Sequence, residues 1–363
     1  MRLVQRVTTY LKKQRQGKVD ASIYSVPLVS LNLSDIDSNS KQVYGPKSIQ
    51  YDRDQAIVVC LVKDGEKYIE SFIDYYLRVG FRHIVFLDND SRDNTVEIAS
   101  KYDHVTVLHS KLPFKYHQYS LRQYLIQRYA KDRWSLCVDI DEFFDWPFSN
   151  KLSLKSLIEY LNENRYTAVV GQMLDMFTDE VLLSTQFFNT KNWRKKFRYY
   201  DVSNIRKLPY ANDHYKKNVN EATNSKSNPD IKSHFGGIRD SIFNIPDLYV
   251  TKHPLVFLDD KIKPQMRVHL IENSSIADFS CVLYHYKFLD NFLDKVHQAV
   301  NDQNYRASSY EYKRYLSALS SNPALNLKGK TAKELQTTAQ LLEDGLIVVS
   351  EKYLSFVNNI CND

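Results

Sequence analysis

Two aspartates spaced one residue apart, Asp139 and Asp141, follow the largely apolar run at residues 134–138. Residues i and i+2 of a β-strand project to the same side, so the two carboxylates can converge beyond the strand end. Two charges at the edge of an apolar core are costly unless something compensates them. A divalent cation carrying a diphosphate would do so, because Mg²⁺ and Mn²⁺ prefer carboxylate, water and phosphate oxygens. The pair predicts a metal–diphosphate site, and a solvated acidic loop is the alternative.

A second acidic cluster follows another apolar run. Residues 83–87 run into Asp88, Asn89 and Asp90, and residues 56–61 form a third strand-like run further upstream. Ligands of parallel sheets bind beyond the carboxyl ends of the strands. Because both acidic clusters lie at such ends, a functional site is favoured over two unrelated loops.

The segments between these runs have helical periodicity. From Ile69, apolar residues recur at offsets of three, four, seven and eight, and Gly80 stands where a helix is expected to end. Alternating strands and helices predict an α/β fold with a mostly parallel sheet and right-handed crossovers.

Several motifs together resemble a known family, the family 2 type of glycosyltransferase with a GT-A fold, in particular a bacterial subgroup. In chain order they are Asp88-Asn89-Asp90-Ser91 with Asp93 and Thr95, Trp134 with Asp139-Ile140-Asp141-Glu142-Phe143, Met173-Leu174-Asp175-Met176, Phe235-Gly236-Gly237-Ile238-Arg239, Thr251-Lys252-His253-Pro254-Leu255 and Leu283-Tyr284-His285-Tyr286-Lys287-Phe288-Leu289. The resemblance spans about residues 54–350. Two departures are Asp64-Gly65-Glu66, where many members have Asn-Glu, and His253, where an apolar residue is usual.

The resemblance implies a GT-A (Rossmann-like) sheet flanked by helices and followed by a C-terminal helical extension. It also implies transfer of a sugar, with a UDP-sugar as the expected donor, to a glycan or lipid-linked acceptor in surface-polysaccharide synthesis. The implied metal ligands for Mn²⁺ or Mg²⁺ are Asp139, Asp141 and His285. Asp141 is the first choice for direct contact, whereas Asp139 would bind the metal through water or hold the donor ribose. For His285 alone, a hydrogen-bonded core histidine would be the alternative.

Donor binding is expected from Asp88, Asn89, Asp139, Lys252 and Arg239. Asp88 should contact the base or ribose, whereas Lys252 and Arg239 are phosphate candidates. Three further side chains carry open alternatives. Asp90 or Asp93 would support the turn, Asp93 is also expected to cap a helix beginning at Asn94, and Arg122 either reaches the phosphates or is a solvated surface residue.

Members of this family invert the anomeric centre, which requires a general base for the acceptor hydroxyl. Asp175 is the candidate, because it ends the predicted strand at residues 168–174. Asp179 and Glu180 compete with it, and a structural role for Asp175 is the alternative.

Two other functions fit parts of the pattern. A nucleotidylyltransferase also holds a metal–nucleotide with paired carboxylates, but residues 63–66 are a poor version of its glycine-rich, basic loop. A catalytically inactive GT-A scaffold or glycan-binding module is the second rival, and the intact Asp139, Asp141 and His285 argue against it.

The chain is expected to divide into three parts. Residues 1–51 form a basic segment and linker, residues 52–290 the glycosyltransferase domain, and residues 291–363 a helical region. Residues 191–235 are expected to be a lid or acceptor-recognition insertion, with a variable surface loop as the alternative. Helices are predicted near residues 288–300 and 310–320, and from the capping-box spacing of Thr331 and Glu334.

Composition indicates a soluble enzyme without a membrane span or signal segment. The cysteines are Cys60, Cys137, Cys281 and Cys361, and three lie in apolar runs, which indicates core residues in a reducing compartment. Residues 1–18 hold six Lys and Arg and no acid, which equals the formal net charge of +6. They can form a basic amphipathic helix on an anionic membrane, or a tail, or a helix packed on the body. A cytoplasmic protein, peripheral at the inner membrane face and without a nucleic-acid partner, is therefore expected.

Overall fold

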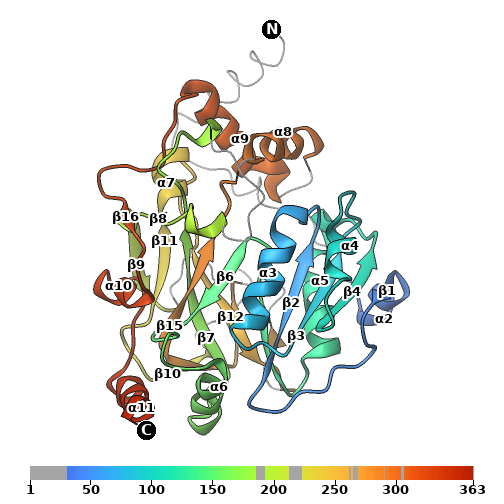
Figure 1. The fold of residues 1–363 in the computed structure, drawn as a ribbon, viewed down its shortest axis with the longest axis vertical. Helices are drawn as coiled ribbons and strands as arrows, with labels where there is room; N and C mark the ends of the chain where they lie inside the picture. Colours follow the sequence, from blue (N-terminus) through green and yellow to red (C-terminus); the bar gives the residue numbers. More distant parts are fainter. Residues whose placement is uncertain are drawn as a thin grey trace.

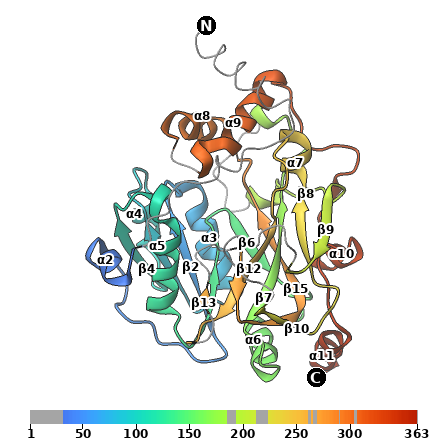
Figure 2. The same ribbon diagram turned by 180° about the vertical axis from the view of Figure 1, so that it is seen from behind.

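The computed structural model describes residues 31–184, 193–211, 223–260, 263–264, 269–289, 291–303 and 306–362. Within these residues a ten-stranded sheet has the order β1-β4-β3-β2-β5-β12-β7-β15-β10, and β6 pairs with β15. Helices cover both faces of this sheet, and two further helices lie above one edge of it (Figures 1 and 2). The α/β fold predicted from the sequence is confirmed.

One half of the sheet holds the three apolar runs that the sequence indicates. Its strands are β1 (Ser40–Tyr44), β2 (Ala56–Val62), β3 (His83–Asp88), β4 (Val105–Ser110) and β5 (Trp134–Cys137). β2, β3 and β5 are fully buried, as expected of strands covered by helices on both faces. β1 comes from the segment expected to be a linker, yet it pairs antiparallel with β4 and forms the edge of the sheet.

The other half of the sheet is built from later segments. Its strands are β6 (Glu142–Asp145), β7 (Ala168–Asp175), β10 (Ser225–Lys226), β12 (Thr251–Phe257) and β15 (Ser275–His285). β15 runs parallel to β7, whereas β12 runs antiparallel to both β5 and β7. Because β12 is antiparallel to both of its neighbours, β7 runs in the same direction as β5. The carboxyl ends of β2, β3, β5, β7 and β15 therefore meet at the same edge of the sheet. This arrangement brings the motif residues of distant segments together.

The helices that flank the sheet are amphipathic or buried along one face. They are α2 (Leu33–Ser38), α3 (Glu66–Arg78), α4 (Thr95–Ala99), α5 (Phe114–Tyr129) and α6 (Leu154–Glu163). Alternate residues of β2 serve opposite layers: Val58 packs in the core that includes α3, and Val59 packs in the core that includes α5. α3 ends where Gly80 adopts a φ of +106°, as the sequence predicts.

The chain after the sheet is mainly helical. Its helices are α8 (Phe292–Asp302), α9 (Arg306–Ser321), α10 (Thr338–Glu343) and α11 (Glu351–Asn362). A further helix, α7 (Ile238–Phe243), lies earlier in the chain, before β12. α7, α8 and α9 share a third apolar cluster, centred on side chains such as Phe288 and Tyr315. α8 and α9 correspond to the helices predicted near residues 288–300 and 310–320.

The helix predicted from Thr331 is wrong. Residues Lys333–Glu334 form the short strand β16, which pairs antiparallel with β8 (Tyr199–Tyr200). The hydroxyl of Thr331 donates to Asp201 at 2.6 Å instead of capping a helix. A tertiary pairing therefore prevails over a local capping signal.

The insertion expected at residues 191–235 is partly described. Its described residues include β8, β9 (Ile205–Pro209), β10 and β11 (Lys232–Gly236), and β9 pairs antiparallel with β11. β13 (Lys263–Pro264) and β14 (Ile271–Glu272) form a further short pair. The division of the chain into three parts stays a prediction. Cys60, Cys137 and Cys281 are buried free thiols, as expected.

Candidate active site

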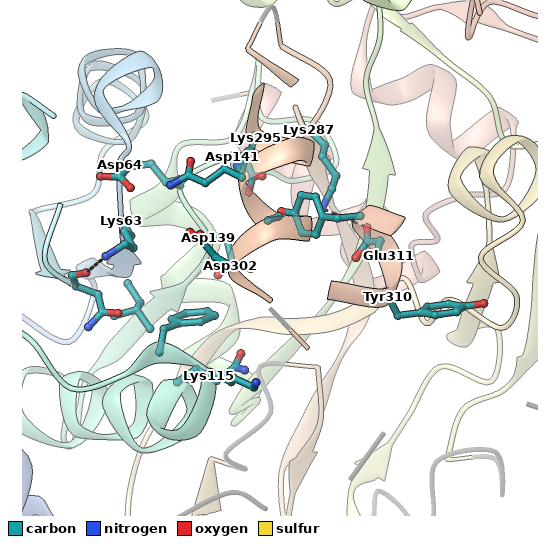
Figure 3. Close-up of a pocket in the computed structure, with 18 of the residues that line it drawn as sticks. Lys63, Asp64, Lys115, Asp139, Asp141, Lys287, Lys295, Asp302, Tyr310 and Glu311 are labelled. Atoms are coloured by element: carbon teal, nitrogen blue, oxygen red, sulfur yellow. Dashed lines mark hydrogen bonds and ion pairs between the residues drawn. The ribbon is translucent and has the colours of Figure 1, made fainter. Parts of the chain in front are cut away.

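A cavity of about 960 Å³ lies beyond the carboxyl ends of β2, β3 and β5. Its lining includes Lys63 after β2, Asn89 after β3 and Asp141 after β5, whereas residues of α8 and α9 line the opposite side. In Figure 3 the side chains of Asp141, Lys287 and Lys295 lie near one another at this cavity. None of the described residues between 193 and 235 lines it.

Asp141 and His285 face each other at the cavity wall. β6 pairs antiparallel with β15 so that Glu142 is opposite His285, which places the residue before β6 beside the end of β15. The Asp141 Oδ2 and His285 Nε2 atoms are 3.5 Å apart, and the two side chains are 13% and 7% exposed. Burial disfavours the charged carboxylate, yet His285 holds the pKa of Asp141 well below its usual range.

Asp139, the other carboxylate of the pair, is already bound by two cations. Its Oδ1 accepts from the Arg122 guanidinium at 2.5 Å, and its Oδ2 accepts from Lys252 Nζ at 3.1 Å. Burial opposes its ionisation, but Lys252 and Arg122 keep the pKa of Asp139 well below its usual range. Arg122 is thus not a solvated surface residue. It is buried, and it lines the cavity from α5.

Glu142 completes this network. Its carboxylate forms an ion pair with Lys252, and its Oε2 accepts from the backbone N–H of Asp139 at 3.0 Å. Lys252 therefore lies between two carboxylates, and Glu142 fixes the turn between β5 and β6. The network holds the loop that carries Asp141 in one conformation.

The described residues contain no group of three or more His, Cys, Asp or Glu side chains placed to hold a metal ion. Asp141 and His285 offer one carboxylate oxygen and one imidazole nitrogen toward the cavity. Mg²⁺ commonly takes only one or two carboxylates and completes its shell with water and phosphate oxygens, and imidazole and carboxylate ligands also suit Mn²⁺. Two protein ligands thus fit a cation whose other ligands come from a diphosphate.

Asp175 lies behind His285, away from the cavity wall. The strands β7 and β15 place it directly opposite His285, whose Nδ1 is 2.5 Å from Asp175 Oδ1. The other oxygen, Oδ2, accepts from Arg239 Nε at 2.8 Å. Both oxygens of this carboxylate have partners, and the side chain is only 6% exposed. Asp175 would have to break its contact with His285 or with Arg239 before it could accept a proton directly from a substrate.

Three of the expected donor-binding side chains are also buried away from the cavity lining. Lys252 and Arg239 are held by carboxylates, and Asp88 is 1% exposed at the end of β3. Burial raises the pKa of Asp88, and its Oδ2 accepts from the backbone N–H of Ser91. Asn89 does line the cavity, where its amide donates to the carbonyl oxygens of Ser110 and Leu112.

Other side chains supply positive charge to the cavity. Arg122, Lys63, Lys115, Lys287 and Lys295 all line it. In Figure 3 Lys63 and Lys115 lie apart from Lys287 and Lys295, which lie near each other. Sequence reasoning overlooked Lys287 and Lys295, although Lys287 is two residues after His285 and strand alternation predicts that it shares the direction of that side chain.

The remaining candidates have structural roles. Asp93 accepts from the backbone N–H groups of Glu66 and Thr95, so it ties α3 to α4, and α4 begins one residue later than expected. Asp179 accepts from Tyr199 at 3.2 Å, and Glu180 pairs with Lys196 at 2.9 Å. Neither acid lines the cavity.

Comparisons with known proteins matched one family model and solved structures. Residues 56–218 match the model of the family described as Glycosyl transferase family 2. That segment contains β2 to β7 and both aspartates of the 139–141 pair. The crystal structure of TarS from S. aureus is similar with a TM-score of 0.28 and 21% identity, over 36% of this chain and 26% of that chain. No curated protein matches the chain.

Proposed function

We propose that the protein transfers a sugar from a nucleoside-diphosphate donor to a hydroxyl of a glycan or lipid-linked acceptor in a metal-dependent, inverting reaction. The observation that carries this proposal is the cavity wall where Asp141 and His285 lie 3.5 Å apart. The similarity of residues 56–218 to family 2 glycosyltransferases supports the same reaction class. A UDP-sugar is the proposed donor.

The groups around this pair suit a diphosphate leaving group. Asp141 and His285 would hold Mn²⁺ or Mg²⁺, and the bound cation would neutralise the charge that develops on the diphosphate. Lys287 and Lys295 line the cavity and lower the pKa of Asp141 through their charge, so both lie within electrostatic reach of that carboxylate. Asp139 acts through its neighbours, because it orients Arg122 at the wall.

The general base requires a carboxylate with an oxygen directed at the acceptor. Asp175 lacks this access in the structure, since His285 and Arg239 occupy it. Asp294 and Asp302 on α8 line the cavity and are exposed. We assign the general base to one of these two residues. Replacement by Asn should lower kcat by about 10²-fold or more only for the residue that acts as the base.

A nucleotide-sugar screen tests the proposal without an acceptor. We expect one UDP-sugar to be hydrolysed slowly in the presence of Mn²⁺, with release of UDP and a sugar of inverted anomeric configuration by NMR. Release of pyrophosphate would indicate a nucleotidylyltransferase instead. Binding of every donor without any hydrolysis would indicate an inactive module.

Asp141→Ala tests the metal site. The variant should keep its melting temperature within a few degrees but lose Mn²⁺-dependent binding of UDP in calorimetry, because one of two protein ligands is gone. The control is Asp260→Ala, whose side chain is 85% exposed and pairs with Lys131. Unchanged UDP affinity of Asp141→Ala would refute the assignment.

A further inference from the structure

Arg239 is a buried cation that contacts two carboxylates from different parts of the chain. Its Nε donates to Asp175 at 2.8 Å, and its NH1 lies 3.3 Å from Glu311 Oε1. The side chain is only 6% exposed, and Arg239 does not line the cavity. An ion this deeply buried is costly unless its partners are well placed, so its position is strongly constrained by both acids.

The first contact reaches the metal site. Asp175 accepts from His285 Nδ1 at 2.5 Å, which fixes the proton of the imidazole on Nδ1. The other ring nitrogen, Nε2, faces Asp141 Oδ2, 3.5 Å away, and a bound cation would take its lone pair. A carboxylate behind a histidine ligand orients the ring and increases its basicity. Arg239 in turn fixes the carboxylate.

The second contact reaches a cation at the cavity wall. Glu311, on α9, accepts from Arg239 and from Lys287 Nζ at 3.2 Å. Lys287 is two residues after His285, and both side chains line the cavity. Glu311 also binds the hydroxyl of Tyr315 on its own helix. Lys287 and Arg239 hold the pKa of the Glu311 carboxyl well below its usual range in spite of its burial.

We propose that Arg239 is a positioning residue that sets two arms of the active site at once: the Asp175–His285 arm for the metal and the Glu311–Lys287 arm for the donor diphosphate. This inference rests on the proposed function. His285 is the last residue of β15 and Lys287 follows it by two residues, and a single guanidinium with several fixed donors can hold both carboxylates behind them. Through the contact between Glu311 and Arg239, α9 is connected to the residues of the proposed metal site.

The arms can be separated by two readouts: the Mn²⁺ concentration that gives half-maximal UDP binding, and the UDP affinity at saturating Mn²⁺. Asp175→Asn should raise the Mn²⁺ midpoint by about 10-fold or more, the usual effect of removing an outer-shell partner of a metal ligand. Its UDP affinity at saturating Mn²⁺ should change less than about 2-fold. Glu311→Gln should do the opposite, with a several-fold loss of UDP affinity and an unchanged Mn²⁺ midpoint.

Arg239→Met should move both quantities, and Arg239→Lys should restore only part of the loss, because an ammonium group lacks the planar fork of donors. The matched control is Arg198→Gln, which removes an exposed pair with Glu334 at 3.0 Å outside the cavity. Should Arg239→Met fail to fold, Arg239→Lys, which keeps the charge, tests the role of Arg239, and the two carboxamide variants test the separate arms. Equal shifts of both quantities in Asp175→Asn and Glu311→Gln, or no shift in either, would overturn the inference.

Histidine NMR without metal distinguishes failure of this inference from failure of the proposed function. The wild-type spectrum should show His285 protonated on Nδ1, and Asp175→Asn should weaken or change that signal. If wild-type protein binds no UDP with Mn²⁺, the proposed function fails, whereas the Nδ1–H signal still reports the positioning arm. A His285 ring protonated only on Nε2 would overturn the arm itself.

Discussion

At the scale of single residues, the site is organised by buried cations that lie between carboxylates. Lys252 comes from β12 and lies between Asp139, in the turn after β5, and Glu142, the first residue of β6. Removing one partner from such a network leaves an uncompensated buried charge, which typically costs about 3–5 kcal/mol. The geometry of the site therefore depends in part on Lys252 and Glu142, which do not line the cavity.

His253 is a second buried polar residue whose state the structure explains. Its Nδ1 lies 2.9 Å from the carbonyl oxygen of His269, and its Nε2 lies 2.8 Å from the hydroxyl of Tyr210. Burial lowers the pKa of His253 to about 4. The ring is therefore neutral, and it satisfies one donor and one acceptor in a position where related sequences are expected to carry an apolar side chain.

This lowered pKa predicts a pH dependence of stability. Between pH 6.5 and about 4 the unfolded chain binds a proton at His253 that the folded protein does not, so the free energy of unfolding falls as the pH falls through this window. The loss reaches up to about 3 kcal/mol, at about 1.4 kcal/mol per pH unit. Urea denaturation of wild type and His253→Gln at pH 7, 5.5 and 4.5 should show a shallower pH slope for the variant. Parallel slopes would contradict the prediction.

At the scale of elements, strand ends and tight turns decide where the chemistry can occur. The apolar run at residues 134–138 ends as β5 at Cys137, and the chain re-enters the sheet as β6 at Glu142. Asp139 and Asp141 therefore lie in a turn fixed at both ends. The Gly236-Gly237 turn likewise fixes the position of Arg239, because it leads directly from β11 into α7, the helix that carries Arg239.

Gly236→Ala should be strongly destabilising. The backbone of Gly236 has a φ of +93°, and a Cβ there would lie 2.6 Å from the carbonyl oxygen of Asn204. We expect a loss of more than about 2 kcal/mol in the free energy of unfolding, from a strained φ and a clash with backbone. The control is Gly329→Ala, where nothing lies within 4 Å of the added Cβ. Chemical denaturation of both variants checks this, and equal stability of the two would show that the turn tolerates a side chain.

At the scale of the whole molecule, the cavity is lined by segments that lie far apart in sequence, between residues 61 and 312. The sheet edge supplies Asp141 and His285, and α8 and α9 supply the facing wall, as the position of these helices above the strand ends shows (Figure 1). The region expected to recognise the acceptor, residues 191–235, contributes none of its described residues. The role of residues 191–235 in acceptor recognition therefore stays a prediction.

Membrane contact is a property of the whole chain that remains a proposal. The basic residues 1–18 lie outside the described residues, and no described helix is both long enough and apolar enough to cross a bilayer. If residues 1–18 bind an anionic surface, each Lys or Arg contributes on the order of 1 kcal/mol. Screening over about 8–10 Å makes this attraction steeply dependent on salt.

Deletion of residues 1–18 tests this proposal. We expect full-length protein to co-sediment with anionic vesicles at low salt and to be released as salt rises, because the attraction is electrostatic. The truncated protein should stay in the supernatant and retain its hydrolysis of the donor. Equal sedimentation of both proteins would refute the membrane proposal, and loss of solubility on truncation would indicate a helix packed on the body.

The sequence by itself determined the α/β class, the strands β2, β3 and β5, and the position of the Asp139–Asp141 pair. These features follow from local information: apolar runs of strand length, amphipathic spacing in α3 and a glycine at its end. Periodicity and turn chemistry depend on near neighbours, so they can be interpreted without the fold.

Only the tertiary structure decided which charged groups meet. Arg239, Asp175 and Glu311 are separated by 64 and 72 residues along the chain, and no local pattern indicates that they share an ion-pair network. Thr331 is a second example. Its capping-box spacing predicts a helix, but the residues that follow it form a strand that pairs with β8. Buried charges are placed by their partners across the sheet, because the cost of desolvation is met only where distant segments bring opposite charges together.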